Sequence, residues 1–133
     1  MQNKQKLVVV FIILALAGLA CGGSISTANI SSAKMTSDEG GTQETSVFAP
    51  DQIFYCIVEL ANAPDDTVVK AVWTAVSVQD TDPNTLIDSS TLTSGDGTLT
   101  FNLTNNSAWP VGSYKVELYL NDKLDRTLEF EVR

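Results

Sequence analysis

The chain has 133 residues, with 8 basic and 16 acidic side chains, no histidine and two cysteines. This length favours one compact domain. Without histidine, the chain alone cannot build a histidine general base, a Ser-His or Cys-His nucleophile pair or a histidine metal site. Two cysteines are too few for a Cys-rich zinc or iron–sulfur centre. The net charge of −8 argues against nucleic acid as a partner, because its backbone attracts clustered Lys and Arg.

The first twenty residues predict an export signal. Lys4 and Lys6 give a positive start, and residues 7–17 form an uncharged apolar stretch. A stretch of this length is typical of the apolar region of a signal peptide and is too short to span a bilayer as a helix. We therefore expect residues 1–20 to be a signal peptide.

The segment Gly18-Leu19-Ala20-Cys21 resembles the lipobox of bacterial lipoproteins, although Gly18 stands where leucine is commonest. The resemblance implies cleavage between Ala20 and Cys21. It also implies a thioether-linked diacylglycerol and an N-acyl chain, such as palmitate, on Cys21. Two or three acyl chains give stable attachment, which one chain does not. The alternatives are an uncleaved anchor helix and an ordinary secretory signal, and both leave the position of Cys21 unexplained.

Residues 21–46 are expected to be the lipidated cysteine and a flexible tether. The segment is rich in Ser, Thr and Gly and has no aromatic residue. Such a sequence buries too little apolar surface to offset the entropy of ordering it, which predicts disorder. Loss of residues 1–20 removes Lys4 and Lys6, so the net charge of −8 becomes −10 on the exported part.

Residues 47–133 show the period of two that β-strands have. Apolar and polar residues alternate in segments separated by turn signals, without a sustained helical period. No crossover helix is available, so parallel pairing is not expected. Phe48 could add a short first strand, giving seven. We predict an all-β, antiparallel β-sandwich with strands near residues 52–60, 67–78, 86–92, 99–103, 114–120 and 127–132. The weak, Ser- and Thr-rich segment 86–92 is expected to be an edge strand.

Several segments resemble immunoglobulin-like or fibronectin-III-like domains of bacterial surface lipoproteins. They are Ala63 to Trp73, the Pro110-Val-Gly112-Ser-Tyr114 unit that opens a late strand, and the closing Phe130-Glu-Val132. The resemblance implies a domain over residues 47–133 that binds a partner or acts as a spacer, and it supplies no catalytic motif. The immunoglobulin disulfide is absent because Cys56 has no partner cysteine, so packing, centred on Trp73, must hold the sheets together.

Individual residues have a structural and a functional interpretation. Cys56, in an apolar strand, is interpreted as a core residue rather than a reactive thiol. Trp73 has small neighbours on its face, which favours core packing over ligand stacking. Tyr114 is expected to point inward and bond to the backbone as in a tyrosine corner.

Two candidate binding sites follow from the sequence. Tyr55, Ile57 and Tyr119, with Trp109 beside them, would form a partner patch if they were exposed on one sheet. The alternative is that an edge strand or the Trp109 loop covers them. Oxygen-bearing side chains also recur at alternate positions as they do at the start of a calcium loop, but the Gly and Glu that complete the loop are missing, which favours a solvated turn. These candidate metal ligands are Asp80, Asp82 and Asn84.

The sequence therefore predicts a non-catalytic lipoprotein, anchored in a bacterial cell membrane or outer membrane and facing away from the cytoplasm. It needs no cofactor beyond the lipid on Cys21. Its immunoglobulin-like domain would bind a protein or glycan partner. One alternative is a structural protein that maintains the envelope without a specific ligand. The other is a domain that binds a solute with the help of Ca²⁺.

Overall fold

The computed structural model of the protein describes residues 27–133. The predictions of a signal peptide and of lipidation at Cys21 lie outside these residues. No helix in the described part is long and apolar enough to cross a membrane. The described residues form eight strands: β1 (Asn29–Thr36), β2 (Val47–Phe48), β3 (Phe54–Ala61), β4 (Thr67–Val78), β5 (Thr85–Ser94), β6 (Gly97–Leu103), β7 (Gly112–Leu120) and β8 (Lys123–Val132).

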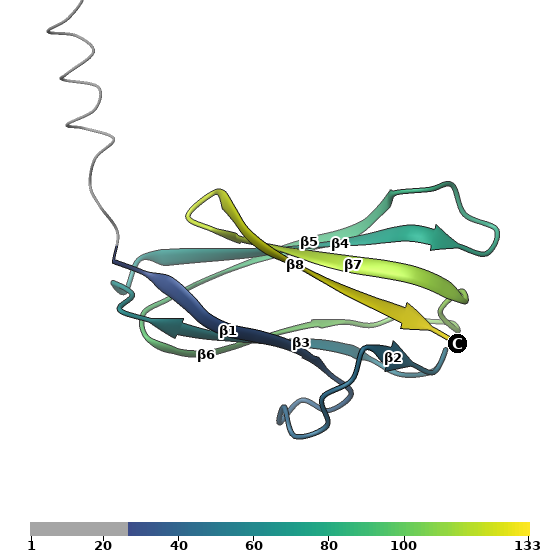
Figure 1. Ribbon diagram of the computed structural model, residues 1–133, viewed down its shortest axis with the longest axis horizontal. Helices are drawn as coiled ribbons and strands as arrows, with labels where there is room; N and C mark the ends of the chain where they lie inside the picture. The colour runs from purple at the N-terminus through teal and green to yellow at the C-terminus, as the bar shows by residue number, and fades with distance from the viewer. Residues whose placement is uncertain (1–26) are drawn as a thin grey trace, which may run out of the picture.

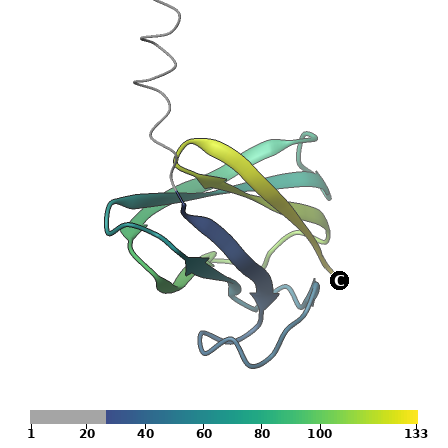
Figure 2. The same ribbon diagram turned by 60° about the vertical axis from the view of Figure 1, so that its left-hand side comes forward.

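The strands form two sheets that face each other across one core (Figures 1 and 2). The smaller sheet has the order β1-β3-β6, and the larger has the order β2-β8-β7-β4-β5. The predicted β-sandwich is confirmed, with eight strands rather than seven. β5 is an edge strand, as expected.

One pair of strands is parallel, which the sequence did not lead us to expect. Phe48 of β2 pairs with Val132 of β8 in the parallel direction. The missing crossover helix does not forbid this pair, because five other strands separate β2 from β8 along the chain. The chain enters β2 from β1, which belongs to the opposite sheet.

The predicted disordered tether is wrong for residues 29–36, because they form β1. This strand pairs with β3 along its length, and Ile30 and Met35 are buried in the core. A β-bulge between Ile30 and Ser32 shifts the register. Ala33, rather than Ser32, therefore joins the two buried side chains against the core. The folded domain thus begins well before the predicted boundary at residue 47.

Six aromatic residues form the centre of the core, and Phe54 lies in the middle of them. Its ring centroid is 4.5 Å from that of Trp109, with the rings stacked, and 4.8 Å from that of Phe130. The other three lie at centroid distances between 5.0 and 6.5 Å, and all come from the larger sheet, opposite Phe54: Phe48, Trp73 and Tyr114. Trp73 is 1% exposed, which confirms its predicted place in the core.

The predicted roles of Tyr114 and Cys56 are also confirmed. Tyr114 is buried, and its hydroxyl donates a hydrogen bond to the carbonyl oxygen of Pro110, the contact expected of a tyrosine corner. Cys56 is a free, fully buried cysteine. Burial raises the pKa of its thiol to about 12, so the nucleophilic thiolate is disfavoured at neutral pH.

Candidate functional site: the outer face of the larger sheet

The candidate patch of aromatic residues does not exist as one surface. Tyr55 and Ile57 lie on β3 in the smaller sheet, whereas Tyr119 lies on β7 in the larger sheet. Trp109 is buried in the core, and its indole N–H donates a hydrogen bond to the carbonyl oxygen of Gln52 at 3.1 Å. The prediction is wrong because the order of strands between the sheets cannot be read from alternation alone.

Ile57 points away from the core but is still only 6% exposed. Residues 37–46, which link β1 to β2, cover it. Gly41 of this link lies so close that a Cβ placed there would be 3.2 Å from Ile57 Cγ1. The Asp38 carboxylate accepts hydrogen bonds from the main-chain N–H groups of Thr42 and Gln43 at 3.0 and 2.7 Å. The hydrogen bond from the Thr42 hydroxyl to this carboxylate lowers the pKa of Asp38 most, and the two main-chain bonds lower it further.

The candidate calcium ligands lie in the loop between β4 and β5. Asp80 and Asn84 adopt positive φ angles of 58° and 56°. The N–H of Asn84 donates to the carbonyl oxygen of Val76, and the main-chain oxygen of Asp82 accepts from the Thr85 hydroxyl. These features are those of a turn. Within residues 27–133, no three or more carboxylate, thiol or imidazole groups gather where they could hold a metal ion.

The outer face of the larger sheet is the most distinctive surface of the domain. Three half-buried valines follow the outward side of the central strand β4: Val68, Val72 and Val76. Beside Val68 and Val72, the Lys70 ammonium lies 4.9 Å from the ring centroid of Tyr119 on β7, within the range of a cation–π contact. This face therefore combines β-branched apolar side chains with an aromatic ring and an ammonium group that contact each other.

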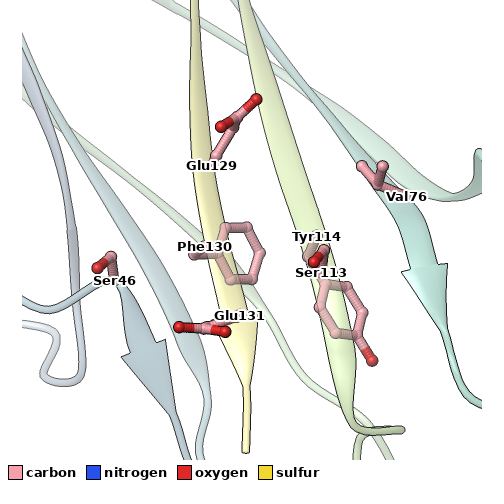
Figure 3. Close-up of a pocket in the computed structure, with 7 residues that line it drawn as sticks. All are labelled: Ser46, Val76, Ser113, Tyr114, Glu129, Phe130 and Glu131. Carbon is pink, nitrogen blue, oxygen red and sulfur yellow. The ribbon is translucent and has the colours of Figure 1, made fainter.

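A shallow groove of about 390 Å³ lies on this face, beside residues 129–131 of β8 (Figure 3). Val76 forms one side of it and Ser46 the other. Ser113 of β7 and the two glutamates of β8 lie between them, as the close-up shows. The groove is thus lined by two hydroxyls and two carboxylates next to one valine, together with main-chain parts of β7 and β8.

The two glutamates differ in their neighbours. Glu131 forms an ion pair with Arg133 at 2.7 Å. Glu129 lies opposite Lys115 in the β7–β8 ladder, yet the Lys115 ammonium contacts Glu117 instead, at 3.7 Å. Among the described residues, Glu129 forms no ion pair. Its carboxylate is therefore the group in the groove most available to a cation from another molecule.

The groove was not predicted from the sequence, although part of its signal was present. Alternation along β8 already places Glu129 and Glu131 outward. The groove itself requires Ser46 to lie beside β8, where its carbonyl oxygen accepts the Glu131 N–H at 2.9 Å. It also requires an extra residue in β4, between Ala75 and Ser77, that interrupts the pairing with β7. Neither the β2–β8 contact nor the bulge has a local sequence signature.

Comparison with known proteins identifies the fold alone. No protein family and no curated protein sequence matches the chain. The domain is similar to an immunoglobulin-like protein from Pseudomonas aeruginosa, with a TM-score of 0.55 and 15% identity over 83% of this chain and 99% of that one. It is also similar to part of the alkylpurine DNA glycosylase AlkC of Pseudomonas fluorescens, with a TM-score of 0.52 and 17% identity over 81% of this chain and 31% of that one. The described residues therefore have an immunoglobulin-like β-sandwich fold.

Proposed function

We propose that the protein is a non-catalytic lipoprotein, anchored through Cys21 in the bacterial cell envelope, whose immunoglobulin-like domain binds a protein partner. The binding surface is the outer face of the larger sheet, and the partner presents a basic side chain to the groove. The observation that carries this assignment is Glu129, a carboxylate at the groove that forms no ion pair within residues 27–133.

The character of the face favours a protein over a glycan. Sugar rings commonly stack on a free aromatic ring, and the Tyr119 ring is already in contact with Lys70. The other half-exposed tyrosine, Tyr55, lies on the opposite sheet. Valines bordered by charged and hydroxyl groups instead match the apolar centre and polar rim of a protein interface. A structural role without a ligand is the competing function, and the test below separates the two.

Reversing the charge at Glu129 is expected to weaken partner binding strongly without unfolding the domain. Detergent-solubilised full-length protein with Glu129→Lys should recover at least about tenfold less of the partner from its own cells than the unchanged protein, because a like charge now faces the basic side chain. The measurement is affinity capture followed by quantitative mass spectrometry of the recovered proteins.

The matched control is Glu39→Lys, which makes the same change of charge in the exposed link between β1 and β2. It should leave capture unchanged. Equal loss in both variants would assign the effect to net charge and contradict a site in the groove. Absence of any partner specific to the unchanged protein would favour the structural role.

Lipidation is tested at the two cysteines of the chain. Cells fed labelled palmitate should incorporate it into the unchanged protein and into Cys56→Ala, and Cys21→Ser should carry no label. Intact mass should show a chain that begins at Cys21 and carries acyl groups. Label on Cys21→Ser, or a chain that retains residues 1–20, would contradict the proposed anchor.

A further inference from the structure

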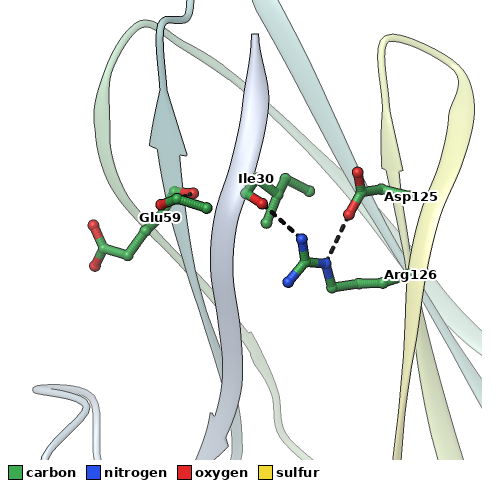
Figure 4. Close-up of polar contacts among 5 residues, drawn as sticks. Ile30, Glu59, Asp125 and Arg126 are labelled. Atoms are coloured by element: carbon green, nitrogen blue, oxygen red, sulfur yellow. Dashed lines mark hydrogen bonds and ion pairs between the residues drawn. The ribbon is translucent and has the colours of Figure 1, made fainter.

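Three of the edges of the two sheets are shortened, bent or covered. β1 has the bulge at Ile30, and β6, with seven residues, is the shortest described strand after β2. At one end, β2 covers β8. Further along β8, the Arg126 guanidinium crosses to the other sheet and donates to the carbonyl oxygen of Ile30 at 2.6 Å (Figure 4). Devices of this kind keep sheet edges from pairing with other chains.

β5 lacks these protections over residues 88–94. It has ten residues, most of them exposed, and contains no Lys, Arg or Pro. Its only charged residue is Asp88. It has one irregularity, near Ile87, and pairs regularly with β4 from Asp88 to Ser94. No other strand among residues 27–133 pairs with its outer edge.

The main-chain groups on this free edge can be identified. In the neighbouring strand β4, the Val68 carbonyl oxygen accepts the N–H of Asn121, on the β7 side. Main-chain directions alternate along a strand, so Val69 and the residues at alternate positions after it direct their groups toward β5. Their partners on β5 are Leu92, Ser90 and Asp88.

The intervening residues of β5 therefore direct their N–H and C=O groups away from β4, toward the free edge. These residues are Ser89, Thr91 and Thr93. A separate observation agrees with this assignment: the Ser89 N–H donates to the carboxylate of Asp88 at 2.9 Å rather than to a strand. The edge thus offers three residues whose main-chain groups are oriented to pair with another strand.

We propose that β5 pairs antiparallel with β5 of a second copy of this chain, about a two-fold axis that passes through Thr91. The two larger sheets then join into one continuous sheet. In this register Thr91 faces Thr91 of the second copy, and Ser89 faces Thr93 of the second copy. All three residues whose main-chain groups face the free edge are then paired on each copy, with the Ser89 N–H exchanging the Asp88 carboxylate for the carbonyl oxygen of Thr93 of the second copy. The contact is identical on both copies, as a two-fold interface requires.

Charge selects the same register. With the axis at Thr91, Asp88 lies opposite Ser94 of the second copy, and the two Asp88 residues are six positions apart along the strand pair, roughly 20 Å. An axis at Ser89 would bring the two carboxylates close together, and it would place the irregularity near Ile87 inside the interface. A strand pair of this length buries less than a stable interface requires, so the dimer is expected to be reversible and to depend on concentration.

Disulfide trapping tests both the pairing and its register. Residues directly opposite in a hydrogen-bonded antiparallel pair have Cα atoms about 5.5 Å apart, within the range that a disulfide spans. The full-length protein with Thr91→Cys, reconstituted in lipid vesicles and mildly oxidised, should form a covalent dimer at least about ten times faster than the unchanged protein. The unchanged protein reports the background from Cys56, the cysteine that lipidation leaves as a thiol.

Thr93→Cys is the matched control, because it is the same substitution on the same side of β5. In the proposed register the two Thr93 residues are four positions apart, about 13 Å, so this variant should remain at background. Ser89→Cys should behave in the same way. A mixture of Ser89→Cys and Thr93→Cys should form mixed dimers, since these two positions face each other.

Dimers from Thr91→Cys and from the mixture, with none from either single control, support the proposed register. Equal trapping of Thr91→Cys and Thr93→Cys would show random collision and overturn it. Trapping of Thr91→Cys at background would also overturn it. These results do not depend on capture of another protein, so they can be told apart from a failure of the function proposed above.

Discussion

Replacing Phe54 with alanine is expected to lower the free energy of unfolding by about 3–5 kcal/mol, as for other truncations of buried phenylalanines. Phe54, from the smaller sheet, is fully buried and lies against five other aromatic rings, four from the larger sheet and Trp109 from the loop between β6 and β7. Its removal leaves a cavity that the flat rings around it cannot refill without leaving their own contacts. Small domains are stable by about 5–15 kcal/mol, so this variant should be close to unfolding at growth temperature.

Urea unfolding of the full-length protein, followed by tryptophan fluorescence, measures this effect. Both tryptophans of the chain contact Phe54, so the signal reports the core directly. Leu86→Ala is the control, since Leu86 is 62% exposed and its truncation should change stability by less than about 0.5 kcal/mol. A similar loss in both variants would contradict the central role of Phe54.

Gly112→Ala is expected to lower the free energy of unfolding by about 2–5 kcal/mol, from crowding and backbone strain together. Gly112 opens β7 with a φ angle of 148°. A Cβ at this position would lie 2.3 Å from the carbonyl oxygen of Ser77 and 2.6 Å from Val78 Cα. Both are backbone atoms of β4 beside its bulge, so relief of the contact requires the two strands to separate.

Gly97→Ala separates the two contributions. Gly97 also has a positive φ, 131°, but a Cβ there would meet no atom within 4 Å. Gly97→Ala should therefore show only the strain of the backbone conformation, and Gly112→Ala should lose about 1–3 kcal/mol more. Urea midpoints of the two variants make the comparison, and equal losses would show that the approach of β4 at Gly112 has no effect.

The sequence predicted a strand correctly wherever one face of that strand is buried and the other is exposed to solvent. The segment 67–78 coincides with β4, because Val69, Ala71 and Trp73 alternate with more exposed residues. β1 was missed because its bulge breaks this alternation: the residues that face the core are Ile30, Ala33 and Met35. An edge strand with so few buried side chains has the composition of a linker, and only its pairing with β3 identifies it.

The candidate site was less predictable, because it depends on which strands become neighbours. Outward residues such as Glu129 could be identified from alternation. The grouping of Tyr55 with Tyr119 failed, since consecutive strands such as β3 and β4 belong to different sheets. In the core, the sequence pointed to Trp73 as the centre, whereas Phe54 makes more aromatic contacts. Position along one strand does not reveal what the opposite sheet places against it.

The early start of β1 also determines how the domain would stand on a membrane. With the proposed anchor at Cys21, only residues 22–28 separate the lipid from Asn29, an extended length of roughly 25 Å at most. Asn29 pairs with the last residue of β3, so the turns at residues 62–66, 95–96 and 121–122 lie at this same end (Figure 1). They carry four aspartates, which anionic headgroups repel. The short tether would hold the acidic end of the domain just above the bilayer, with the C-terminus directed away from the membrane.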